Sequence, residues 1–171
     1  MSVFKALMRL LTRAPAAAGA EVVTNEAIYR SGLREALWPE MGAAVMKMQQ
    51  LLAALPDETE GIDIGIHPDP DQDGTFTVMA HVFGPDLYTL NKAVAPYREL
   101  VSVRFTAAGP VPPVPVPNSF GADFPTNDII CDIAADWVGE VWFHADGPVS
   151  GAGNVIFGDE GYGAGLPRNL A

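Results

Sequence analysis

The sequence is poor in cysteine, in positive charge and in long apolar runs. Its one cysteine, Cys131, excludes an internal disulfide framework and a zinc site built from several thiolates, and it fits a reducing compartment such as the cytoplasm. Ten Lys and Arg residues against 21 Asp and Glu give a net charge of −11. This balance argues against nucleic acid as a direct partner, because such binding draws on cations that neutralise phosphates. No apolar run approaches the ~18–20 residues that cross a bilayer, so we do not expect a membrane partner.

Motifs for nucleophiles and nucleotide cofactors are also absent. No serine lies in a GxSxG elbow. The glycines between 151 and 165 match neither the dinucleotide fingerprint nor a P-loop, because too few residues follow them to form a helix. Cys131 adjoins Asp132 and follows Asp128 by three residues, and their negative charge opposes the thiolate that a nucleophile needs. We therefore expect no enzymatic activity and no bound cofactor.

The three histidines, His67, His81 and His144, do not follow HExxH or another fixed ligand spacing. His67 and His81 could face each other across a hairpin, near enough to Asp69 to suggest a metal site or an acid/base pair. Ordinary strand or surface histidines are the alternative, and we favour it.

What is present indicates one folded domain with an N-terminal extension. The chain has 171 residues, 49% of them hydrophobic, which is enough for a substantial core. Residues 1–20 read as a basic N-terminal helix with an Ala-rich linker, and residues 21–171 as a single α+β domain. A signal peptide is the alternative for the N-terminus, but Arg9 interrupts the apolar region that it needs. A weak interfacial membrane anchor is another alternative.

Apolar periodicity predicts the elements of this domain. We expect a helix or two over 24–55 with a break at Pro39, strands at 62–67 and 75–83 in a hairpin, a helix at 87–97, a strand at 100–106, a proline-rich extended segment at 109–125, a helix at 127–143 and a short strand at 154–157. The order is α-α-β-β-α-β-loop-α-β. It predicts an α+β fold with a mainly antiparallel sheet of about four strands packed against helices.

The predicted helix at 127–143 carries a row of carboxylates at four-residue spacing: Asp128, Asp132, Asp136 and Glu140. Each like-charged i,i+4 pair costs about 0.2–0.5 kcal/mol, and no Lys or Arg lies between them. The row has three interpretations. It is a solvated helix face, a divalent-metal site completed by another element, or a docking surface for a basic protein, which would explain the missing counter-charges.

A second acidic motif lies in the expected hairpin turn. Asp69, Asp71 and Asp73 alternate and are followed by Gly74, as in the first half of a calcium loop. The second half is missing, because Ala80 occupies the position of the bidentate Glu. An acidic turn is therefore the favoured interpretation, and calcium or another divalent metal the alternative.

Four segments of the chain resemble a family of small acidic bacterial proteins of unassigned function. They are DQDGTF at 71–76, GPDLYTLNKA at 84–93, ADWVGEVW at 135–142 and DEGYG at 159–163. The resemblance covers about Thr24 to Pro167. It implies a shared fold and a bacterial cytoplasmic origin, and it transfers no catalytic residue.

The leading functional hypothesis is a non-enzymatic protein-binding domain. Its face would consist of the four carboxylates with Trp137 or Trp142 as an aromatic anchor. The most specific version of this hypothesis is an immunity or inhibitor protein for a cationic partner such as a toxin. The competing hypothesis is a metal-binding protein centred on Asp69, Asp71 and Asp73.

Overall fold

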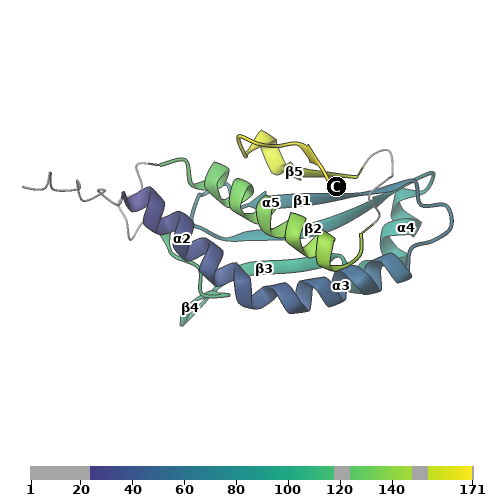
Figure 1. Ribbon diagram of the computed structural model, residues 1–171, viewed down its shortest axis with the longest axis horizontal. Helices are drawn as coiled ribbons and strands as arrows, with labels where there is room; N and C mark the ends of the chain where they lie inside the picture. Colours follow the sequence, from purple (N-terminus) through teal and green to yellow (C-terminus); the bar gives the residue numbers. More distant parts are fainter. Residues whose placement is uncertain (1–23, 118–123, 148–153, 171) are drawn as a thin grey trace, which may run out of the picture.

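The structure is a computed structural model that describes residues 24–117, 124–147 and 154–170. The basic helix and Ala-rich linker expected at residues 1–20 lie outside these ranges. The described chain has an α+β architecture in which helices pack against a sheet (Figure 1).

The first helical segment begins and bends as its sequence predicts. Helix α2 (Asn25–Leu37) starts after Thr24, whose hydroxyl accepts a hydrogen bond from the Ala27 amide at 3.2 Å. Pro39 then lies in a 3₁₀ turn, η1 (Trp38–Glu40), which leads directly into α3 (Met41–Ala53). Proline has no amide hydrogen to donate, so the helix tightens and turns at this point.

The predicted hairpin is confirmed. Strands β1 (Gly61–Pro68) and β2 (Phe76–Phe83) pair antiparallel over their whole length, and Gly74 closes their loop with a φ of 96°. β3 (Glu99–Thr106) extends the sheet on the other side of β2. Asp86 caps α4 (Leu87–Ala93) by accepting from the Thr89 amide, as expected, but the helix stops before Pro96, which lies in the separate turn η2 (Ala95–Tyr97).

The prediction of an α+β fold with a mainly antiparallel sheet is confirmed, since four of the five strand pairings are antiparallel, but the expected number of about four strands is wrong. The sheet has six strands in the order β4-β3-β2-β1-β5-β6, and β1 and β5 (Val155–Gly158) are parallel. The physical reason is α5 (Thr126–His144), because a helical crossover returns the chain to run alongside β1 in the same direction. The remaining strands are short edges, β4 (Gly109–Val111) from the proline-rich segment and β6 (Arg168–Asn169) from the expected tail.

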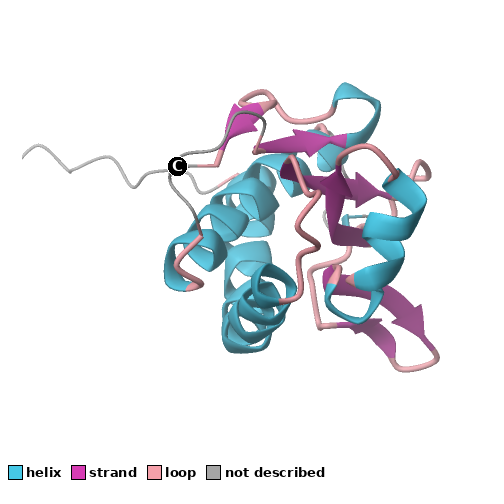
Figure 2. Cartoon of the chain, turned by 90° about the vertical axis from the view of Figure 1, so that its right-hand side faces the viewer, coloured by secondary structure: helices cyan, strands magenta, loops and turns pink. Residues whose placement is uncertain are grey.

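The strands have one covered and one open face. Alternate residues such as Ile62, Ile64 and Ile66 are at most 2% exposed and contribute to the core, where α2, α3 and α5 pack. Figure 2, a view from the end, shows the long helices together on one side of the strands. Intervening residues such as His67 and His81 lie on the open face, and these two are half-buried.

Helix α5 is the central element of the core. Most of its side chains are buried, and its exposed strip is narrow. No helix in the described ranges combines the length and the apolar content that a membrane span requires.

Candidate functional site

The carboxylates of α5 meet a segment that is distant in sequence. The C-terminal loop, residues 159–167, leaves β5 and lies along α5 before it enters β6 at Arg168. The amide of Gly163 donates to Asp128 at 2.9 Å, and the amide of Gly165 donates to Asp132 at 3.3 Å. The sequence suggested that the four carboxylates have no partners within the chain. This is wrong for the first two, Asp128 and Asp132, because both accept hydrogen bonds from backbone N–H groups.

Asp136 has a true counter-charge. Arg168 Nη1 lies 2.8 Å from Asp136 Oδ1 in an ion pair that is partly open to solvent. The contact joins residues 32 positions apart, so helical spacing alone could not reveal it. Glu140, the last of the row, is different. Its side chain is 63% exposed, and its contact with His144 is long, at 3.9 Å.

Asp136 and Glu140 form the common wall of two surface hollows. One, of about 170 Å³, lies where α2 and η1 approach α5. Its other lining side chains are apolar except for one cation, Arg34: Leu37, Met41, Ile133 and Trp137. The other is shallow and lies toward Phe143 and Arg168. Two aromatic rings border these hollows, Trp38 and Phe143, and each is 71% exposed. The exposed end of α5 therefore combines two carboxylates, of which only Asp136 has a close ion-pair partner, with exposed aromatic surface.

The aromatic anchors predicted from the sequence are misplaced. Trp142 is 1% exposed and belongs to the core, and Trp137 is 6% exposed and contributes to a wall. Trp38 was not predicted as an anchor, although its position in the sequence is informative. It precedes Pro39 at the helix bend, where a large side chain does not continue the apolar stripe.

The hairpin carboxylates act within their own turn. Asp69 accepts from the Asp71 amide at 2.9 Å, and Asp73 accepts from the amide and hydroxyl of Thr75, both at 2.7 Å. Asp69, Asp71 and Asp73 do not form a group of ligands for a metal ion, and neither does any other set of three His, Cys, Asp or Glu side chains in the described ranges. The geometry therefore favours the acidic-turn interpretation.

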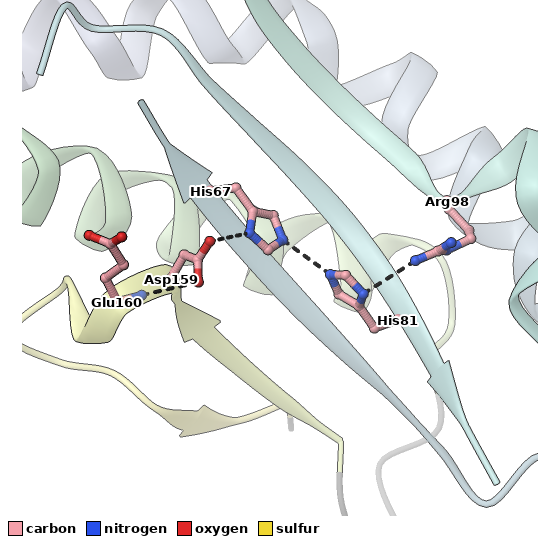
Figure 3. Close-up of polar contacts among 5 residues, drawn as sticks. All are labelled: His67, His81, Arg98, Asp159 and Glu160. Atoms are coloured by element: carbon pink, nitrogen blue, oxygen red, sulfur yellow. Dashed lines mark hydrogen bonds and ion pairs between the residues drawn. The ribbon is translucent and has the colours of Figure 1, made fainter. Parts of the chain in front are cut away.

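A chain of polar contacts crosses the open face of the sheet (Figure 3). His67 Nε2 and His81 Nε2 lie 3.1 Å apart, so the two rings do face each other, the arrangement that the sequence left as one of two interpretations. Their outer partners are not Asp69 but Asp159, 3.0 Å from His67 Nδ1, and Arg98, whose Nη2 lies 3.2 Å from His81 Nδ1. Asp159 starts the C-terminal loop, and Arg98 precedes β3.

Burial and charge perturb the groups of this chain. Burial lowers the pKa of His81 to about 4, and the Arg98 guanidinium and His67 add to this effect while Asp159 opposes it. The hydrogen bond from His67 lowers the pKa of Asp159. His81 is therefore neutral at physiological pH.

Cys131 is the chemically inert thiol that the sequence predicts. It is buried, and its burial together with Asp128, Asp132 and Asp159 raises its pKa to about 12. Cβ atoms built on Gly158 and Gly163 would each lie 3.1 Å from an atom of Cys131, so the thiol lies directly beneath the C-terminal loop.

Comparison of the chain with curated proteins and with solved structures gave no match. A protein-family model does match, over residues 24–170, which agrees with the extent of the resemblance seen in the sequence. The chain therefore belongs to DUF6389, a family of unknown function.

Proposed function

We propose that this domain binds another protein through the exposed end of α5 and the adjoining turn η1. The docking surface consists of Trp38, Asp136, Glu140 and Phe143. The observation that carries the proposal is that two rings, each 71% exposed, border the same pair of carboxylates. Exposed aromatic surface next to charge is typical of interaction sites.

The rings and the carboxylates would contribute differently to binding. Covering an exposed tryptophan is worth about 2–3 kcal/mol, whereas an exposed ion pair is worth about 0.2–1 kcal/mol. Affinity would therefore come mainly from Trp38, and selectivity for a cation from Asp136 and Glu140. The partner that fits is a segment with Lys or Arg beside an apolar side chain. The indole N–H of Trp137, which has no acceptor among the described residues, is a further unmet donor in the wall of the hollow.

A cation of the partner would have to compete with Arg168 for Asp136. At Glu140 it would meet no comparable competition, because the contact of Glu140 with His144 is long. An inhibitor of a basic protein is the narrower form of this proposal, and the net charge of −11 favours it by steering cationic partners toward the domain.

A displayed library of random peptides, panned against the protein, tests the proposal. We expect the selected peptides to pair a basic residue with an aromatic or aliphatic one. The substitution Trp38→Ala should weaken their binding about tenfold or more. Glu140→Gln should weaken it only a few-fold and should reduce its dependence on salt.

Tyr88→Ala is the matched control, because Tyr88 is an equally exposed ring on α4, away from the docking surface. Peptides without basic residues, or peptides that bind Trp38→Ala and the unaltered protein equally well, would refute the proposed surface.

A further inference from the structure

Residues 1–13 of the chain have the composition that the docking surface would select in a partner. They contain three cations, Lys5, Arg9 and Arg13, and no Asp or Glu, although the whole chain has a net charge of −11. Large apolar side chains such as Leu7 and Leu11 lie between the cations. The segment therefore places Arg beside aliphatic side chains, which is the chemistry inferred above for the partner.

The spacing within this segment matches that of the surface. The cations recur every four residues, as do Asp136 and Glu140 on α5. The larger apolar residues have the i, i+3, i+4, i+7 spacing of one helix face: Phe4, Leu7, Met8 and Leu11. A helix laid beside α5 would place its apolar face at the hollow and its cations near the two carboxylates.

The segment is attached close enough to reach the docking surface. Helix α2 begins at Asn25, and its last residue, Leu37, lines the hollow next to Trp38. The 13 residues of α2 span about 20 Å at 1.5 Å per residue. Residues 14–24, which connect the basic segment to α2, span up to about 36–40 Å when extended. The connection is therefore long enough to bring residues 1–13 alongside the far end of α2.

Charge limits how the segment can lie on the surface. The hollow is lined by one cation, Arg34, which belongs to α2. The cations of the segment therefore lie on the opposite side, toward α5. Glu140 is the carboxylate that receives them there, because its contact with His144 is 3.9 Å long, whereas Asp136 is paired with Arg168 at 2.8 Å.

Covalent attachment favours this contact over binding by a free segment. A short flexible linker gives its two ends an effective concentration in the millimolar range, so even a weak contact forms for much of the time. The contact is weak because the hollow is small, about 170 Å³, and one of its two carboxylates is already paired. The segment therefore covers Trp38 for part of the time and gives way to a partner that binds more tightly.

We propose that residues 1–13 bind the docking surface of their own chain and compete there with the external partner. The inference rests on the proposed function, since it uses the same surface. It makes the segment an internal competitor, which a partner displaces before it contacts Trp38 and Glu140. The segment lies outside residues 24–170, which the family model matches, so the competitor is an addition to the domain that defines the family.

The first test measures how strongly acrylamide, an uncharged quencher, reduces the emission of Trp38 in the full chain. Trp38→Phe supplies the emission of the other two indoles for subtraction. We expect the double variant Leu7→Ser, Leu11→Ser to increase the quenching about twofold, because its segment no longer covers the ring. Ala16→Ser, Ala18→Ser is the matched control, since it makes serines in the linker, and it should behave as the unaltered chain. Equal quenching in the two double variants would overturn the proposal.

The second test separates failure of this inference from failure of the proposed function. The selected library peptides should bind the Leu7, Leu11 variant about threefold more tightly than they bind the unaltered chain or the linker control, because the competitor is removed. Peptides that depend on Trp38 but bind all three chains equally would refute the internal competitor and leave the docking surface intact. Peptides that do not depend on Trp38 would refute the surface itself.

Two other positions of the segment are outcomes of these measurements. If the quenching of Trp38 falls as the protein concentration rises, the segment binds a second copy of the chain. If the quenching is equal in both double variants, and the unaltered chain but not the Leu7, Leu11 variant sediments with vesicles of an anionic phospholipid, the segment is a membrane anchor. Either result would overturn the contact within one chain.

Discussion

A single residue, Gly65, determines whether the polar contacts between Asp159, His67, His81 and Arg98 fit on the open face of the sheet. Glycine within a strand normally weakens it by about 0.5–1 kcal/mol, because it gains nothing from packing and loses more backbone freedom. At Gly65 this cost is offset, since the missing side chain leaves the space in which His67 and His81 meet. The position needs glycine for the sake of its neighbours, with no requirement from its own backbone conformation.

Replacement of Gly65 by alanine should therefore be destabilising. The new methyl group would displace His67 and Phe157, and overpacking of this kind costs about 1–3 kcal/mol. Urea unfolding followed by circular dichroism measures the change. Gly42→Ala is the control, because a Cβ there meets nothing within 4 Å and alanine favours the helix, so this variant should be equally or more stable than the unaltered protein. Two variants of equal stability would contradict the packing argument.

At the scale of elements, side chains provide the hydrogen bonds to β2 beyond the point where its pairing with β3 ends. The pairing of β2 with β3 shifts at Met79 and ends at Glu99. Beyond it, the backbone of Ala80 bonds to Arg98 through the Arg98 carbonyl and Nε, each at 2.8 Å. The backbone of Val82 bonds to the side-chain amide of Asn91, at 3.0 Å and 2.6 Å. Arg98 and α4 thus complete a strand edge that would otherwise be unpaired.

Asn91→Ala should cost about 1–3 kcal/mol in the free energy of unfolding, because it leaves the N–H and C=O groups of Val82 without partners. Lys92→Ala changes the next residue, which is exposed, and should cost far less. The same urea titration separates the two variants. A loss in Lys92→Ala as large as that in Asn91→Ala would contradict the role of the strand edge, because alanine favours the helix at both positions and only Asn91 contacts Val82.

Local patterns predicted the elements whose partners are close in sequence. The β1–β2 hairpin, the Asp86 cap, the bend at Pro39 and the buried face of α5 all follow from spacing within a few turns or residues. The facing histidines belong to this group, since they are 14 residues apart across a hairpin.

Contacts across long separations could not be predicted in this way. Asp159 is 92 residues from His67, and Arg168 is 32 residues from Asp136. Both contacts depend on the parallel placement of β5, which no period in the sequence encodes. For this reason the sequence did not reveal the hydrogen-bond and ion-pair partners of the α5 carboxylates, and it did not reveal the exposed rings that border Glu140.

At the scale of the whole molecule, the half-buried histidine His81 makes stability depend on pH. The pKa of His81 is about 4 in the folded chain against an ordinary value of 6.5. Between these values the unfolded chain binds a proton that the folded chain does not, so acidification favours unfolding. The contribution of His81 is complete above pH 6.5 and is lost as the pH falls toward 4.

The loss due to His81 should be about 1–2 kcal/mol once the partial exposure of the ring to solvent is allowed for. Unfolding free energies of the unaltered protein and of His81→Gln, each measured at neutral pH and near pH 4, give this value as a difference. The comparison cancels the titration of Asp63, which both chains share, and leaves that of His81 together with its coupling to Asp159. A pH dependence that is the same in both chains would count against a neutral, half-buried His81.

The placement of the tryptophans has a practical consequence. Of the three indoles in the chain, two are 6% and 1% exposed, whereas Trp38 projects into solvent at one rim of the hollow. A dissolved cationic quencher such as caesium will therefore quench the emission of Trp38 far more than that of the other two indoles. The quenchable fraction is a built-in optical signal for occupancy of this region, and it needs no attached dye.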